Sequence, residues 1–140
     1  MLFRSPPPTA KKVISRPPVR ELRELTNLQT LFLWDTKVTD EGLKELKELK
    51  NLQTLDLGGT KVTDEGLKEL RELTNLQTLD LRHTLVTDEG LKELKKLKNL
   101  TTLYAADTWG VTDEGLKELK EALPKCHIDM YQPRPPASEK

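Results

Sequence analysis

The chain has 140 residues, enough for one domain, and its 23 basic residues balance 23 acidic residues. Net charge therefore gives no reason to expect nucleic acid or an anionic membrane as a partner. Cys126 is the only cysteine, which excludes an intramolecular disulfide. Residues 1–19 hold no apolar run long enough for a signal peptide or a membrane span, so we expect a cytoplasmic protein.

The chain begins with a proline-rich, polar segment. Residues 1–17 are predicted to form a disordered tail, because such a composition cannot build a packed core. Residues 18–25 are predicted to be the helix of an incomplete leading repeat, the N-terminal cap. Leu22 precedes Leu46 by 24 residues, and Pro18 stands at the helix start, where a missing N–H is harmless.

Four near-copies of one unit follow. The unit reads LxxLxLxxTxVTDEGLKELxxLxN, and equivalent leucines such as Leu28 and Leu52 are 24 residues apart. The fourth unit has 25 residues, because it holds one extra residue near Trp109 and Gly110. A period of this length predicts stacked units that bury their apolar faces against one another.

Each unit contains two hydrophobic periods in succession. Leu31 and Leu33 alternate with polar or aromatic residues, which predicts a short strand with one buried face. Three leucines beginning at Leu43 then recur at helical spacing, and Thr39 stands where a helix N-cap is expected. The charged residues between these leucines are predicted to form a solvated surface, with i,i+4 pairs such as Lys44 with Glu48.

A terminal cap is predicted after the fourth unit. Ile128 and Met130 occupy the two strand-core positions of a fifth unit, so we expect a last strand over about residues 127–131. The solenoid is therefore predicted to span residues 18–133. Residues 134–140 are predicted to form a second disordered tail.

The motif LxxLxLxxT followed by VTDEGL resembles the repeats of leucine-rich-repeat proteins. It is especially similar to the ribonuclease-inhibitor-like and F-box-associated branch, and to short bacterial proteins with TDxGL repeats. The resemblance implies an α/β right-handed solenoid, with parallel strands on its concave face and helices on its convex face, that generally serves protein recognition. No F-box-like helical segment precedes the repeats, so a ubiquitin-ligase adaptor is not expected.

Positions at which the near-identical units differ lie on the outward side of the predicted strands and at the strand exits. Taking these positions as ones that the fold does not dictate, we predict a partner-binding surface, because exposed aromatic residues supply large contact area at low rotamer cost. The alternative is that the aromatic residues pack against one another or cover the edge of the solenoid. The predicted partner-binding residues are Phe32, Trp34, Asp35, Asp56, Asp80, Arg82, His83, Tyr104, Asp107, Trp109, Asp129 and Tyr131.

The charge of this surface is mostly negative, since it holds five aspartates against Arg82. A basic segment would be steered there. Aromatic residues are predicted toward both ends, with smaller and charged residues in the middle. Asp56 and Asp80 are predicted neighbours whose repulsion a partner's cation could relieve. Solvated carboxylates that are screened by salt are the alternative.

The sequence thus predicts a non-enzymatic module that binds a protein or a basic peptide, with no cofactor. The strand face measures about 300 Å², against about 800 Å² per partner in a standard interface, which favours a short peptide or a partner that also contacts loop residues such as Lys37 and Trp109. The alternative is a self-assembling structural unit or a consensus-designed scaffold. The strand near Thr30 has no clear partner, so its exposed edge could pair two copies into a homo-oligomer.

Catalytic and metal sites are not expected. Asp56, Asp80 and His83 share one face, but a zinc site needs about three or four converging ligands, and the chain has 2 histidines. Cys126 and His127 are neighbours in a predicted strand, so their side chains should point to opposite faces, and Cys126 is assigned to the terminal cap.

Overall fold

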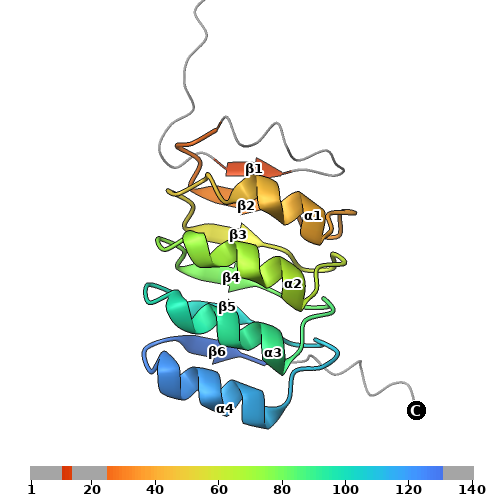
Figure 1. The fold of residues 1–140 in the computed structure, drawn as a ribbon, viewed down its shortest axis with the longest axis vertical. Coiled ribbons are helices and arrows are strands. Elements are labelled where there is room, and N and C mark those ends of the chain that lie inside the picture. The colour runs from red at the N-terminus through yellow and green to blue at the C-terminus, as the bar shows by residue number, and fades with distance from the viewer. Residues whose placement is uncertain (1–10, 14–24, 131–140) are drawn as a thin grey trace, which may run out of the picture.

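The computed structural model describes residues 11–13 and 25–130, and Figure 1 shows two layers, a sheet and the helices that cover one side of it. Within these described residues, six parallel strands lie side by side in chain order. They are β1 (Lys11–Val13), β2 (Thr30–Phe32), β3 (Thr54–Asp56), β4 (Thr78–Asp80), β5 (Thr102–Tyr104) and β6 (His127–Asp129). The predicted α/β solenoid is confirmed.

The helical layer consists of short helices, one after each of the strands β2 to β5. The first three have 4 residues each and continue into a tighter 3-10 turn, whereas the last has 10 residues. They are α1 (Asp40–Leu43), η2 (Lys44–Leu46), α2 (Asp64–Leu67), η3 (Lys68–Glu72), α3 (Asp88–Leu91), η4 (Lys92–Lys96) and α4 (Asp113–Ala122).

A continuous leucine interior lies between the two layers. Strand pairing places Leu31 beside Leu55 and Leu55 beside Leu79, and all three side chains are fully buried. Each such burial contributes about 1.5–3 kcal/mol relative to an exposed side chain, and a single unit could not provide it alone. Ile128 and Met130 are partly buried and pack against this leucine interior.

A hydrogen-bonded clasp joins the helix start of each unit to the next unit. The Asp40 carboxylate accepts the backbone N–H of Thr63 at 2.8 Å and its hydroxyl at 2.5 Å. Thr63 in turn caps its own helix by accepting from the N–H of Glu65. The same carboxylate contacts recur between Asp64 and Thr87 and between Asp88 and Thr112. The Thr-Asp pair of the motif is therefore a junction between units as well as a helix cap.

The glycine of the motif makes room for this clasp. A Cβ atom on Gly90 would lie 2.3 Å from Oδ1 of Asp64, and a Cβ atom on Gly115 would lie 2.0 Å from Oδ1 of Asp88. Atoms do not approach so closely without displacement of the carboxylate. The glycine of the TDEG motif thus leaves space for the aspartate carboxylate of the preceding unit.

The start of the sheet differs from the prediction. Lys11–Val13 were assigned to the disordered tail of residues 1–17, but they form β1, which pairs with β2 in parallel, with Lys11 opposite Thr30. The predicted exposed edge at β2 is therefore covered. A strand can be added through backbone N–H and C=O groups alone, so it needs no leucine pattern that a sequence could reveal.

Other predictions at the chain ends fall on residues that the structure does not describe. These are most of the leading helix, residues 18–24, and the C-terminal tail, residues 134–140.

The charged pairs of the helical layer also differ from the prediction. Lys44 was predicted to pair with Glu48, but its Nζ lies 3.0 Å from Glu41. Glu41 and Lys44 lie about one turn apart in α1 and its C-cap, whereas η2 ends at Leu46, so Glu48 lies beyond the helical segment and is not an i,i+4 neighbour of Lys44. The hydrogen bond to Glu41 raises the pKa of Lys44.

Candidate functional site on the strand face

We call the outward side of β2 to β6, together with the residues at the strand exits, the strand face. Strand pairing places Phe32 opposite Asp56, Asp56 opposite Asp80, Asp80 opposite Tyr104, and Tyr104 opposite Asp129. The structure therefore brings this predicted column together in one row across the sheet. Tyr131, the last residue predicted for the neighbouring column, lies outside the described residues.

Arg82 lies between two aromatic rings near the middle of the strand face. Its guanidinium carbon is 5.9 Å from the ring centroid of Trp34 and 5.1 Å from that of Tyr104. Both distances are within the range of a cation–π contact. The Nε atom of Arg82 is also 3.0 and 3.1 Å from the two carboxylate oxygens of Asp80, and Nη2 bonds to the same carboxylate. We call Trp34, Asp80, Arg82 and Tyr104 the arginine cluster.

Gly58 is the residue that lets Trp34 reach this cluster. A Cβ atom at position 58 would lie 2.5 Å from Cε3 of Trp34, so the indole ring occupies the space that a side chain would take. Trp34 thereby crosses one whole unit, and its ring lies 6.2 Å from that of His83 at an interplanar angle of 79°. Sequence reasoning missed this role of Gly58. The available signal was a glycine in a column that holds Trp34 and Arg82 in other units.

The predicted division of the strand face is wrong for Trp34. Aromatic residues were expected toward the ends and charged residues in the middle. The Trp34 side chain instead extends from the first unit to Arg82 and His83 in the third. The spacing of residues in the chain fixes where a Cα atom lies in the stack. It does not fix the direction of a long side chain, which a small neighbour can redirect.

The two aspartates in the middle of the face have different surroundings. The side chain of Asp80 is 8% exposed and that of its partner Arg82 is 41% exposed. Burial raises the pKa of Asp56, the hydrogen bond from the Gly58 N–H at 2.9 Å opposes this rise, and the nearby Asp80 adds to it. The hydrogen bond to Asp80 raises the pKa of Arg82. The predicted repulsion between Asp56 and Asp80 is present, and a cation of the same chain relieves it.

The residues at the strand exits are constrained by the backbone. Asp35, His83 and Asp107 have φ angles of 57°, 60° and 57°, and Gly59 has a φ of 72°. Aspartate, histidine and glycine are among the residues that tolerate this left-handed region. The prediction that the fold leaves this column free is therefore wrong, although its side chains remain available for contacts. Nε2 of His83 lies 3.6 Å from Oδ2 of Asp107.

Trp109 lies apart from the arginine cluster, in the loop before α4. The N–H of Gly110 bonds to Val86 O just as the N–H of Leu85 bonds to Val62 O in the preceding unit. Gly110 therefore occupies the place of Leu85, and Trp109 is the inserted residue. Trp109 is 81% exposed and Leu85 is 44% exposed. The predicted site residues thus divide between the strand face and this loop edge.

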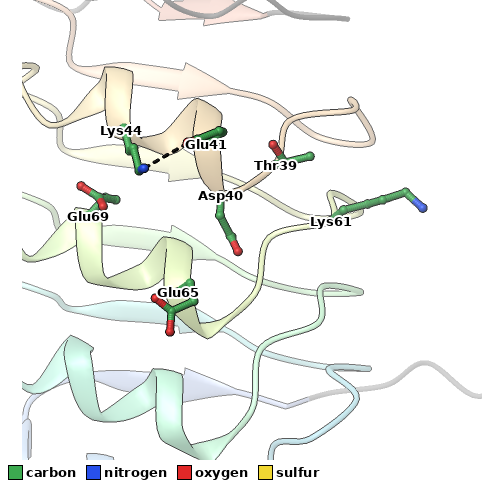
Figure 2. A pocket seen from close by; sticks show the side chains of 7 residues that line it. All are labelled: Thr39, Asp40, Glu41, Lys44, Lys61, Glu65 and Glu69. Atoms are coloured by element: carbon green, nitrogen blue, oxygen red, sulfur yellow. Dashed lines mark hydrogen bonds and ion pairs between the residues drawn. The ribbon is translucent and has the colours of Figure 1, made fainter.

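A shallow groove on the helical layer was not predicted. Figure 2 shows Lys44 turned toward Glu41, while Lys61 extends away from the other side chains. The groove is lined by Thr39, Asp40, Glu41, Lys44, Lys61, Glu65 and Glu69. The Asp40 carboxylate there is already bound by Thr63, and Lys44 by Glu41. We therefore attribute the groove to the stacking of two units.

The described residues contain no group of three or more His, Cys, Asp and Glu side chains that could hold a metal ion. Within the same part of the chain, none of the helices has the length and apolar character needed to cross a membrane. Cys126 is buried, and burial raises the pKa of its thiol, which disfavours the nucleophilic thiolate.

Comparison with known families identifies the repeats. Residues 26–72 match a model of two copies of leucine-rich repeats, and residues 72–95 match a second leucine-rich-repeat model. The chain belongs to the leucine-rich-repeat family. These matches do not distinguish the ribonuclease-inhibitor-like branch from others. No curated protein matches this leucine-rich-repeat chain.

Two internalin structures from Listeria monocytogenes are similar to this leucine-rich-repeat chain. An internalin C2 is 31% identical with a TM-score of 0.61, over 79% of this chain and 46% of the internalin. A second internalin, inlF, is 20% identical with a TM-score of 0.55, over 84% of this chain and 38% of its own, and shows the fold alone. The chain thus spans less than half of each of these two internalins.

Proposed function

We propose that this leucine-rich-repeat chain is a non-enzymatic protein-binding module whose strand face binds an extended, basic peptide segment. The observation that carries the proposal is the arginine cluster. Trp34 is 47% exposed, yet its ring is held by contacts with Arg82 and Gly58. A large aromatic surface that is already fixed loses little conformational entropy when a partner covers it.

Charge favours a basic partner. The strand face holds Asp35, Asp56, Asp80, Asp107 and Asp129 against Arg82, so its formal charge is −4 when His83 is neutral. Such a surface attracts lysine and arginine side chains and rejects acidic segments.

Family membership and the size of the face support the same class of partner. Leucine-rich-repeat proteins are typically interaction modules without enzymatic activity. The strand face is smaller than the standard interface of about 800 Å² per partner, so an extended segment fits it better than a globular surface does. We do not propose self-assembly through β2, because β1 occupies that edge.

Trp34 can report binding if the second tryptophan is removed. In a Trp109→Phe background, fluorescence of Trp34 is titrated with a pool of Lys/Arg-rich peptides and with a Glu-rich pool of equal length. We expect a saturable change with the basic pool alone. Saturable binding of the acidic pool with equal or higher affinity would overturn the proposal.

Calorimetric titration of variants locates the binding surface. Trp34→Ala is expected to weaken basic-peptide binding about tenfold or more, the scale of a buried aromatic anchor. Asp56→Asn, which keeps an acceptor for the Gly58 N–H, is expected to weaken it less. Lys47→Ala, on the helical layer, serves as the matched control and should bind like the parent. Equal affinity of the parent and the folded Trp34→Ala variant would exclude the strand face.

A further inference from the structure

We infer that Trp34, Tyr104 and Asp80 form a binding site for a partner's arginine side chain, and that Arg82 occupies this site when no partner is bound. The inference rests on the proposed function, because it names the group by which a basic segment would be recognised. Arg82 is then an internal ligand that a partner's arginine replaces.

The chemistry around Arg82 is that of an arginine-binding site. Aromatic rings lie at 5.9 Å and 5.1 Å from its guanidinium carbon, one from Trp34 and one from Tyr104. The carboxylate of Asp80 receives the Nε–H at 3.0 and 3.1 Å and a further N–H from Nη2. Stacking on aromatic rings together with paired hydrogen bonds to a carboxylate distinguishes a guanidinium from a lysine ammonium.

The site and its occupant differ in how firmly they are held. The Asp80 side chain is 8% exposed and its carboxylate also accepts the backbone N–H of Arg82 at 3.0 Å, so the backbone fixes it. The Arg82 side chain is 41% exposed. Rotation of the Arg82 side chain alone could vacate the site, with no change in the backbone.

Exchange avoids the usual cost of breaking a buried ion pair. Removing one partner of such a pair is unfavourable, because the other charge stays buried and uncompensated. If a second guanidinium enters as Arg82 leaves, Asp80 is paired before and after. Asp56, opposite Asp80 in the neighbouring strand, adds negative charge that favours retention of a cation.

An internal ligand lowers the apparent affinity for an external one. A tethered group competes at an effective concentration on the order of millimolar or higher, and only the vacant fraction of sites can bind a partner. Removing the guanidinium of Arg82 should therefore strengthen the binding of a small arginine probe. An arginine that itself contacts the partner would show the opposite behaviour.

The first test uses acetyl-Gly-Arg-Gly-amide as the probe, with the uncharged citrulline peptide as its control. Trp34 fluorescence is followed in the Trp109→Phe background. Arg82→Gln, which keeps a neutral hydrogen-bond donor beside Asp80, is expected to bind the arginine probe about tenfold or more tightly than the parent. Equal or weaker binding by Arg82→Gln, or equal binding of the citrulline peptide, would overturn the inference.

Arg71→Gln is the matched control, because Arg71 forms an ion pair with Glu93 at 3.5 Å on the helical layer. It removes one guanidinium far from the strand face and should leave probe binding unchanged. Circular dichroism melting of each variant establishes that it is folded.

A second measurement does not depend on a variant. In the parent chain, the Nε–H resonance of Arg82 is followed by NMR during titration with the Lys/Arg-rich peptides. Exchange predicts that it moves to the position of free arginine at saturation. Peptide binding without this movement refutes exchange and leaves the proposed function intact. Probe binding by Arg82→Gln, with no peptide binding by the parent, refutes the proposed function and supports the arginine site.

Discussion

Aspartates recur on both layers of the solenoid, and the two sets differ in what they contact. At the helix starts, the carboxylates of Asp40, Asp64 and Asp88 bind the threonine of the next unit. On the strand face, Asp56 and Asp80 accept backbone N–H groups from their own strand exits, at Gly58 and Arg82. An aspartate that joins two units must be repeated in each, whereas one with contacts inside its own unit can be replaced, as it is by Phe32 and Tyr104.

The strand-exit column shows the limit of this distinction. Its residues differ between units, yet all four that the structure describes adopt a positive φ angle. Variation among Asp35, Gly59, His83 and Asp107 is therefore variation within a class that the backbone permits. Difference between units identifies a recognition surface only after such backbone limits are taken into account.

The largest effect should come from filling the space beneath a clasp. Gly90→Ala places a methyl group 2.3 Å from Oδ1 of Asp64. We expect a loss of about 3 kcal/mol in the free energy of unfolding, from overpacking and from the displaced carboxylate, measured by urea denaturation. In an Asp64→Ala background the same change should cost much less. Additive losses would show that the glycine and the clasp are independent.

Removing one clasp carboxylate should have the next largest effect. Asp64→Ala deletes the acceptor of the Thr87 N–H at 2.7 Å and of its hydroxyl at 2.5 Å, and should cost about 2 kcal/mol. Asp113, the exposed copy in the last helix, is the matched control, and Asp113→Ala should change stability by less than about 0.5 kcal/mol. Thermal unfolding of the two variants compares them directly. Equal losses would contradict a structural role of the clasp.

A substitution at His83 tests whether the positive φ angle restricts which residues a strand exit accepts. His83 has a φ angle of 60°, which a β-branched residue adopts only with strain. We expect His83→Ile to cost about 1–2 kcal/mol and His83→Asn to cost less, because asparagine tolerates this region. Chemical denaturation measures both. If isoleucine proved as stable as asparagine, the column would be free to vary after all.

The smallest predicted effect is a gain in stability that depends on pH. Burial raises the pKa of Asp56, so between the unfolded and folded pKa values the folded chain binds more protons and the parent loses stability as pH rises. Asp56→Asn removes this loss and keeps the acceptor for Gly58. We expect a gain of about 0.5 kcal/mol at neutral pH, after allowing for solvent screening, that disappears below about pH 4. A gain that grows toward acid would have the wrong sign.

The repeat pattern predicted the stacked architecture well, because a period of 24 residues carries both the alternation of strand leucines and the spacing of helix leucines. It also predicted the row from Phe32 to Asp129, since equivalent residues of stacked strands must lie in register. Contacts that cross between units were harder to foresee. The position of Asp40 within its own unit gives no sign that its carboxylate binds Thr63 of the next unit.

Two other features lacked any repeating signal. The pairing of β1 depends on backbone N–H and C=O groups, which every residue except proline carries, so the residue types at Lys11–Val13 do not reveal it. The arginine cluster depends on one long side chain passing over one glycine, Trp34 over Gly58. Neither the composition nor the repeat period predicts that a side chain extends across a neighbouring unit.

The path of Trp34 over Gly58 makes the strand face sensitive to the number of units. Excision of one period, such as residues 52–75, would bring Asp40 next to Thr87, and the clasp could form again with the same partners. Trp34 would then lie on the strand beside Arg82 rather than one strand removed, and the cluster would lose its geometry. Gain or loss of whole units would therefore preserve the scaffold while changing its specificity.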